Sequence, residues 1–178
     1  MKLTKDVRPT TIWFTGLSAS GKSTLSEILY RKLQNIGVEV EILDGESIRD
    51  MLKNYKFDQG SREQLGLQKA KIALELNKQG KVVLVSGIAH KKKWRSDIRK
   101  IIGNYFEVFL NCDVKDCASR DYKGNYSKAL SGQLKNFVGV DEMYEESDEC
   151  ELVLHTGRDS INICADILFE RVKKTIGV

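Results

Sequence analysis

Two patterns of apolar residues alternate along the chain. Short runs rich in β-branched residues are typical of buried strands, and longer stretches with apolar residues every three or four positions are typical of amphipathic helices. This alternation predicts an α/β fold with a mainly parallel sheet, because parallel strands need crossover helices. The expected strands are residues 11–15, 38–43, 82–85, 106–110 and 151–154, and the expected helices are residues 22–35, 48–52, 62–78, 92–102, 114–121 and 161–174.

Residues 122–149 break this alternation, because they are polar, contain glycine and show only weak periodicity. A connection of this length is usually a lid or a binding loop. Its sequence can bury little apolar surface by itself, so we expect it to be mobile without ligand and ordered with nucleotide. We find no repeat, low-complexity tract or linker, so residues 1–178 are expected to form one domain that carries this lid.

Composition narrows the class of protein. The net charge of +4 is only mildly basic, which argues against nucleic acid as a partner. The four cysteines form no CxxC pair, so we expect reduced, packed thiols rather than a zinc site. No signal peptide opens the chain, and no run approaches the roughly 18 apolar residues of a membrane span. We therefore expect a cytoplasmic protein with a small-molecule partner, and we allow for a homodimer.

The first expected strand and helix are joined by a nucleotide-binding motif. Residues 16–23 read GLSASGKS, which fits G-x-x-x-x-G-K-[ST] between a strand and a helix. Glycines let successive backbone N–H groups point at phosphates, and the helix N-terminus adds partial positive charge. Lys22 should reach the β- and γ-phosphates, and the Ser23 hydroxyl should hold Mg²⁺. The predicted ATP-binding residues of this loop are Gly16, Ser18, Ala19, Ser20, Gly21, Lys22, Ser23 and Thr24.

The remainder of the chain favours a small-molecule kinase among P-loop NTPases. The apolar strand at 82–85 ends in Ser86 and Gly87 without a Walker-B acid, and no N-K-x-D segment is present. Asp44 ends the second expected strand, which places it at the crevice edge of a doubly wound sheet. There a carboxylate can accept a hydroxyl proton or hold a magnesium-bound water. The alternative is an Asp-Gly turn without a catalytic role.

Four blocks in order resemble the adenylylsulfate kinases, which phosphorylate the ribose 3′-hydroxyl of adenosine 5′-phosphosulfate. The blocks are residues 16–24 (GLSASGKST), residues 43–46 (LDGE) with Arg49, residues 120–126 (RDYKGNY), and residues 135–141 (KNFVGVD) with Tyr144 and Glu145. The resemblance covers nearly the whole chain. It implies a P-loop fold, ATP with Mg²⁺, and a nucleotide acceptor.

The resemblance also implies roles for matching residues. Asp44 resembles the proposed catalytic base or magnesium organiser, and Arg120 resembles a residue of the ATP lid. The residues that would bind the acceptor are Arg49 and Arg62 on its 5′-anhydride, Phe57 and Phe137 on the two faces of its base, and Lys123 and Lys135 on its negative charge. For Phe57 and Phe137 the alternative is plain core packing.

The departures from the family pattern fall in the acceptor half. Leu65 stands where the family has an asparagine that would hydrogen-bond substrate, two arginines after it are missing, and Ala89-His90 replaces Ser-Pro. This half resembles the cytidine diphosphoramidate kinase of bacterial capsule biosynthesis, whose acceptor is a cytidine nucleotide with a terminal amidate. We favour that activity. The alternatives are an adenylylsulfate kinase, a nucleoside monophosphate kinase, and a non-catalytic nucleotide-binding protein.

A basic run at residues 91–93 has two interpretations. It is either a solvated helix face or a place where an anion relieves the repulsion between cations and a helix N-terminus. His90 beside it either contacts substrate or lies in a surface loop.

Overall fold

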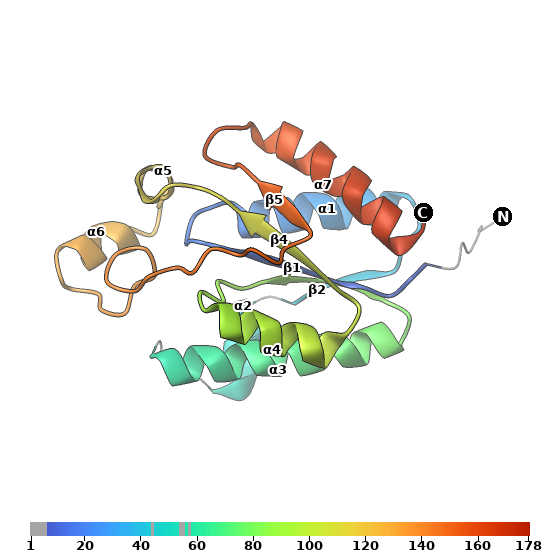
Figure 1. The fold of residues 1–178 in the computed structure, drawn as a ribbon, viewed down its shortest axis with the longest axis horizontal. Coiled ribbons are helices and arrows are strands. Elements are labelled where there is room, and N and C mark those ends of the chain that lie inside the picture. The colour runs from blue at the N-terminus through green and yellow to red at the C-terminus, as the bar shows by residue number, and fades with distance from the viewer. Residues whose placement is uncertain (1–6, 44, 54–55, 57) are drawn as a thin grey trace.

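In the computed structural model, which describes residues 7–43, 45–53, 56 and 58–178, a five-stranded parallel sheet lies between two layers of helices (Figure 1). The strands are β1 (Thr11–Gly16), β2 (Val40–Leu43), β3 (Val82–Ser86), β4 (Tyr105–Leu110) and β5 (Leu152–Leu154). The helices are α1 (Lys22–Asn35), α2 (Gly45–Leu52), α3 (Gln59–Lys78), α4 (Lys92–Ile102), α5 (Val114–Ser119), α6 (Asn125–Leu130) and α7 (Ile161–Ile176). The predicted fold class is confirmed.

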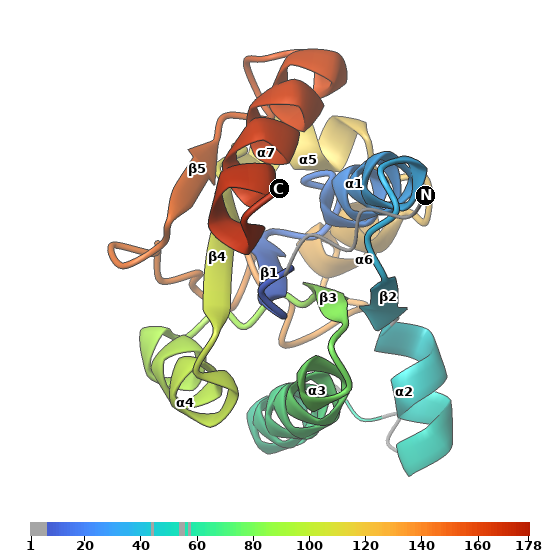
Figure 2. The same ribbon diagram turned by 90° about the vertical axis from the view of Figure 1, so that its right-hand side faces the viewer.

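Side chains that alternate along each strand fill two cores. Ile12 and Phe14 of β1 pack with α1 and α7, whereas Trp13 points to the opposite face and packs with α3 and α4. Val83 and Val85 of β3 also face α3 and α4. Because successive strand residues face opposite sides, strands covered on both faces must be apolar at nearly every position. Figure 2 shows the two helix layers on either side of the sheet.

The strand order β2-β3-β1-β4-β5 places β1 in the middle of the sheet. The chain runs from β1 out to β2, returns through β3, and then crosses to β4 on the other side of β1. The connections therefore diverge at the carboxyl end of β1, which is the position where open α/β sheets bind ligands. The P-loop leaves β1 at this point.

The sequence predicted that residues 122–149 bury little apolar surface by themselves, and in the structure the buried side chains of this segment pack against other parts of the chain. The segment contains α6, and Tyr126 and Phe137 pack with Leu17 of the P-loop in a third hydrophobic cluster. Weak periodicity hid this, because α6 has only 6 residues and buries two of them, Tyr126 and Ala129. Part of the segment therefore packs against the P-loop.

Two further expectations from composition can be compared with the structure. All four cysteines are free, and Cys112, Cys117 and Cys164 are buried, as expected for packed thiols. Among the described residues, no helix is both long enough and apolar enough to cross a membrane.

Candidate active site

The P-loop curls because three of its residues adopt positive φ. Gly16 has φ 145°, and a Cβ there would lie 2.7 Å from the Leu110 carbonyl oxygen, so only glycine fits. Ala19 has φ 59°, and Gly21, the N-cap of α1, has φ 102°. Such a curl brings successive backbone N–H groups to one side, where they can hold phosphate oxygens at the start of α1.

Lys22 lies at the centre of this loop. Its Nζ donates to the carbonyl oxygen of Gly16 at 3.1 Å, to that of Leu17, and to Ser20 Oγ at 3.5 Å. Burial lowers the pKa of Lys22 to about 8, because a desolvated ammonium loses the stabilisation of water. A phosphate at this position would supply the missing counter-charge.

Contacts from distant segments brace the P-loop. Thr156 Oγ1 donates to the Ser20 carbonyl at 2.8 Å, and Tyr126 OH donates to the Ser18 carbonyl at 2.9 Å. Arg120 donates to the Thr156 carbonyl at 2.9 Å, so it is connected to the P-loop only through Thr156. These contacts fix the loop from the α6 side and from the connection between β5 and α7.

A cavity of about 530 Å³ opens beside the P-loop at the carboxyl edge of the sheet. Eight of the predicted site residues line it, namely Ser18, Lys22, Ser23, Arg49, Arg62, Lys123, Lys135 and Phe137. The cavity wall does not include Gly16, Ala19, Ser20, Gly21, Thr24 or Arg120. Asp44 and Phe57 lie outside the described residues, although Gly45 lines the cavity.

Two arginines make this cavity strongly positive. Arg49 and Arg62 both line it, and burial is the main cause that lowers the pKa of each guanidinium. Arg62 Nη2 donates to the Asn136 carbonyl at 2.5 Å, which ties α3 to the loop before Phe137. The Asp141 carboxylate holds the same loop by accepting from the backbone N–H groups of Asn136 (2.6 Å) and Phe137 (2.5 Å).

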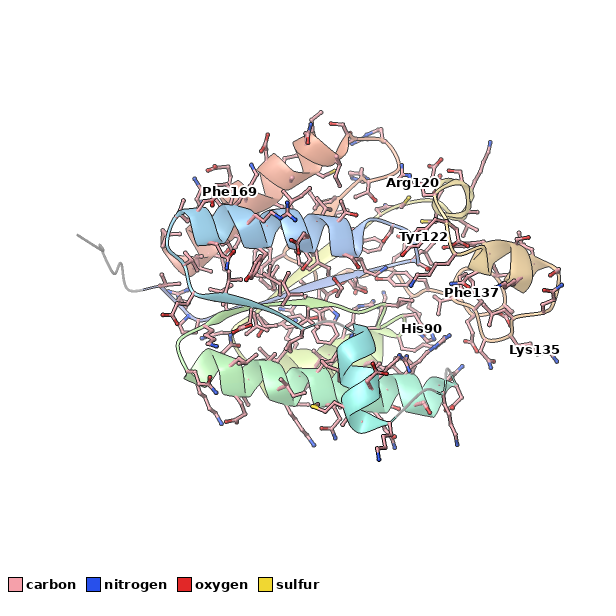
Figure 3. All side chains as sticks on the ribbon, turned by 180° about the vertical axis from the view of Figure 1, so that it is seen from behind. His90, Arg120, Tyr122, Lys135, Phe137 and Phe169 are labelled. Carbon is pink, nitrogen blue, oxygen red and sulfur yellow. The ribbon has the colours of Figure 1, made fainter. Side chains whose placement is uncertain are left out.

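Phe137 is packed in a hydrophobic cluster and also lines the cavity. Its ring is 9% exposed and meets Tyr126 edge-on at 4.8 Å between centroids, so it is part of a packed cluster. It also lines the cavity, where one face can stack on a ring. Figure 3 shows Phe137 and Lys135 towards the α6 end and His90 closer to the sheet.

Comparison with known proteins agrees with this geometry. The family model described as adenylylsulphate kinase matches residues 8–155. The chain belongs to the adenylylsulfate kinase family.

Relatives within this family include two activities. An adenylyl-sulfate kinase of Synechococcus sp. (strain JA-3-3Ab) is 38% identical over 167 residues, which are 93% of this chain and 95% of that protein. A cytidine diphosphoramidate kinase of Campylobacter jejuni is 37% identical over 168 residues, which are 94% of this chain and 95% of that protein. The APS kinase of Mycobacterium tuberculosis, solved in complex with AMPPNP and APS, is 31% identical with a TM-score of 0.86 over 97% of this chain and 99% of that chain. The protein is accordingly a phosphotransferase that acts on a hydroxyl group, and kinases of this family use ATP as phosphoryl donor.

Lys69 is a cavity residue that sequence reasoning missed. It is 4% exposed, and its Nζ donates to the Ser86 carbonyl at 2.9 Å. The same Nζ lies 3.1 Å from where a Cβ on Gly45 would be. The missed signal was its spacing, because Lys69 falls on the buried face of α3 between Leu65 and Ala73.

His90 is not a surface residue. It is 1% exposed, lines the cavity and packs edge-on against Trp94, with 4.7 Å between ring centroids. Burial, followed by the positive charges of Arg62 and Lys91, lowers the pKa of His90 to about 4. Its imidazole is therefore neutral at physiological pH.

The basic run at residues 91–93, interpreted as either a solvated helix face or an anion site, has anionic partners within the chain. The Glu145 carboxylate accepts from the Lys92 backbone N–H at 2.8 Å, at the N-terminus of α4, and lies 3.4 Å from Lys91 Nζ. Lys92 Nζ pairs with Asp148 at 2.6 Å. Within the described residues these contacts account for the run, so it gives no support for an external anion site there.

A second cavity, of about 500 Å³, borders Leu17 and the end of β4. Its walls come from β4, from the segment after β4 and from residues 139–144, without Lys22 or Ser23. Because it lacks the P-loop cation, we assign the candidate active site to the first cavity.

Proposed function

We propose that this protein transfers the γ-phosphoryl group of ATP to the ribose 3′-hydroxyl of a nucleoside 5′-phosphoanhydride. One observation carries the proposal. A single cavity joins Lys22 and Ser23 of the P-loop to Arg49 and Arg62, with the Phe137 ring as a further wall. The first pair suits a phosphoryl donor, the arginines suit an anhydride, and the ring suits a base.

Each residue has a distinct task in this proposal. The P-loop backbone and Lys22 hold the β- and γ-phosphates and neutralise charge as it shifts during transfer. Asp44 is proposed as the base that accepts the 3′-hydroxyl proton. Residues 122–149 are proposed as the lid of a single domain.

The residues present also fit Mg²⁺. Ser23 offers its hydroxyl on the exposed first turn of α1, next to Lys22. Mg²⁺ in such sites keeps several waters and takes few protein ligands beside substrate phosphates. When bound, the ion supplies neutralisation of phosphate charge.

For the acceptor we favour cytidine diphosphoramidate over adenylylsulfate. The support comes from the cavity wall, where Leu65 and His90 replace the family's asparagine and proline and are both buried. Overall identity does not separate the two activities, since the relatives stand at 37% and 38%. Adenylylsulfate is the second candidate, because Arg49, Arg62 and Phe137, which match the family pattern, all line the cavity.

The test is kcat/KM for both acceptors with ATP and Mg²⁺. We expect at least a tenfold higher value for cytidine diphosphoramidate, a margin of about 1.4 kcal/mol in transition-state binding. A preference for adenylylsulfate would assign the protein to sulfate activation.

Two further proposals concern the setting of the enzyme. We propose that it acts in the cytoplasm, where its free thiols stay reduced. We also propose a homodimer, which light scattering on the purified protein would test.

A further inference from the structure

Lys69 is a buried lysine on the side of α3 that faces the active-site cavity. Arg62, Leu65 and Lys69 follow one another at helical spacing, and all three line the cavity. Lys69 is only 4% exposed. Removing an ammonium from water costs free energy, and lysine side chains normally extend into solvent. A lysine at this position therefore indicates a charge that the cavity uses.

The Lys69 ammonium lies at the carboxyl edge of the sheet. Its Nζ donates to the carbonyl of Ser86, which ends β3 beside β1, the strand that leads into the P-loop. The same Nζ lies 3.1 Å from where a Cβ on Gly45 would be, at the start of α2. An ammonium has three N–H donors, so it can hold a ligand oxygen as well as the Ser86 carbonyl. The ammonium thus lies between the P-loop strand and the two helices that carry Arg49 and Arg62.

Lys69 and Lys22 of the P-loop are close enough to repel each other. Burial is the largest cause that lowers the pKa of Lys22, and the positive charge of Lys69 lowers it further. The whole cavity favours anions, because six lysines and arginines line it and Glu63 is the one acid among the described residues that do so. An anion in contact with both ammoniums offsets their repulsion. A P-loop holds the γ-phosphate against its lysine, which makes this group the nearest anion that Lys22 and Lys69 can share.

We propose, on the basis of the function proposed above, that Lys69 is a further catalytic residue whose ammonium binds an oxygen of the γ-phosphoryl group during its transfer. In that step the acceptor 3′-oxygen forms a bond to the γ-phosphorus as the bond to the β-phosphate oxygen breaks. ADP leaves with the electron pair of that bond, and the hydroxyl proton passes to the base proposed above. Lys22 binds the charge on the transferred oxygens from the P-loop, and Lys69 binds it from the β3 side. Arginine fingers perform this task in other P-loop enzymes.

Two substitutions separate the charge of Lys69 from its hydrogen bond. Lys69→Met removes both, whereas Lys69→Gln removes the charge and keeps an N–H donor for the Ser86 carbonyl. Both variants should lower kcat by about 10²–10³-fold and keep KM for ATP and for the acceptor within about threefold, because the contact strengthens in the transition state. Lys71→Gln, which changes an exposed lysine of the same helix, should leave kcat unchanged. Melting temperatures show whether each variant is folded.

A second measurement depends neither on turnover nor on the acceptor. ADP with Mg²⁺ and aluminium fluoride mimics a phosphoryl group in transfer, and calorimetry compares its dissociation constant with that of ADP and Mg²⁺ alone. Lys69→Met and Lys69→Gln should weaken binding of the mimic at least about tenfold and change binding of ADP by less than about twofold. Lys71→Gln should change neither constant.

A double variant tests whether Lys69 acts directly on the phosphoryl group. Gly45, which Lys69 Nζ approaches, follows Asp44 in the sequence, so an indirect action through the proposed base has to be separated. In an Asp44→Asn background, Lys69→Met should still weaken binding of the mimic at least about tenfold. No further loss in that background would make Lys69 a positioning residue for Asp44 and overturn a contact with the phosphoryl group.

The outcomes distinguish this inference from the proposed function. Wild-type kcat in folded Lys69→Met, or a loss in Lys69→Met that is absent in Lys69→Gln, would overturn the role of the charge. Equal dissociation constants of the mimic in the wild type and both variants would do the same. A higher acceptor KM with unchanged kcat would make Lys69 an acceptor ligand instead. Weaker binding of the mimic in both variants, without any acceptor phosphorylated by the wild type, would support Lys69 and contradict the proposed 3′-hydroxyl acceptor.

Discussion

Lys22 is half-buried, and the described partners of its ammonium are two carbonyl oxygens and one hydroxyl of its own loop. Lys22→Met should lower turnover by about 10²–10³-fold or more, because positioned positive charge supplies much of the catalysis of phosphoryl transfer. The melting temperature should stay unchanged or rise, since a desolvated charge opposes folding. Steady-state kinetics and calorimetry measure both, and wild-type turnover in this variant would remove the P-loop from the mechanism.

His90 should make stability depend on pH. Its pKa is lowered to about 4 in the folded chain, by burial first and then by Arg62 and Lys91, against the weaker opposing charges of Glu142 and Glu145. The unfolded chain therefore binds the proton below about pH 6.5, whereas the folded chain binds it only near pH 4. The contribution of His90 to the free energy of unfolding is therefore fully present above about pH 6.5 and decreases as the pH falls towards 4.

When the pH falls from 7 to 5, protonation of His90 in the unfolded chain should reduce the free energy of unfolding by about 1–2 kcal/mol. Urea unfolding of the wild type and of His90→Gln at both pH values measures it. The loss of unfolding free energy between pH 7 and pH 5 should be smaller in His90→Gln by this amount. An equal loss in the two proteins would show that His90 titrates normally.

At the residue scale, the sequence indicated side chains that the structure brings together, and their roles stay predictions. Lys22, Ser23, Arg49 and Arg62 were expected in one site, and all four line one cavity. Lys69, Trp13 and Ser86 were not expected there. Their exposure to the cavity depends on how α3 packs on the sheet and on the space left at Gly87, and a linear motif contains neither fact.

At the scale of elements, α4 begins with three lysines in or beside its first turn and is capped by a carboxylate 53 residues away. Arg95 reinforces the junction, since it donates to the Glu145 carbonyl at 2.6 Å and lies 3.4 Å from the buried Glu107 carboxylate. Glu145→Ala should reduce the unfolding free energy by about 1 kcal/mol, through loss of the cap and of charge that complements the helix dipole. Urea unfolding measures the loss.

A neighbouring residue provides the control for that prediction. Glu146 is exposed and also lies in the segment that follows Tyr144. Glu146→Ala should leave stability within about 0.5 kcal/mol of the wild type. A similar loss in both variants would mean that general charge, rather than the cap on α4, explains the effect.

The proposed lid, residues 122–149, contains both exposed and buried side chains. Tyr122 is 89% exposed and Leu130 is 69% exposed, whereas Tyr126 and Phe137 are buried. We expect trypsin to cut at Lys123, Lys128 or Lys135 in the free protein, and a nucleotide pair of ATP analogue and acceptor to suppress these cuts, because the lid lysines gain anionic partners. Mass spectrometry of the fragments locates the cuts. Cleavage at the same rate with and without nucleotide would contradict a lid.

Elements with a full apolar face were predictable, and short ones were not. The expected helix at residues 92–102 agrees with α4 to the residue, because Trp94, Ile98 and Ile102 repeat at helical spacing. The helix expected at 62–78 begins earlier, at Gln59, since Asp58 caps it by accepting from the Ser61 N–H at 3.0 Å. Helix α6 escaped prediction because its stability comes from Tyr126 docking on the P-loop rather than from its own pattern.

At the scale of the whole molecule, alternation of strands and helices was enough to predict a parallel sheet. It did not give the strand order, which depends on β3 returning beside β1. That order places the P-loop, the start of α2 and the end of β3 around one cavity. The cavity is therefore a consequence of topology.

The central claim is phosphoryl transfer from ATP to a ribose 3′-hydroxyl, and the structure of the product tests it most directly. The wild-type protein is incubated with ATP, Mg²⁺ and cytidine diphosphoramidate or adenylylsulfate, and the nucleotide product is examined by phosphorus and proton NMR. We predict a new phosphate coupled to the ribose H3′, with ADP formed in equal amount. A phosphate added to the 5′ chain would indicate a nucleoside monophosphate kinase, and ADP formed without any phosphorylated acceptor would indicate a nucleotide-binding protein. Either result would contradict the account.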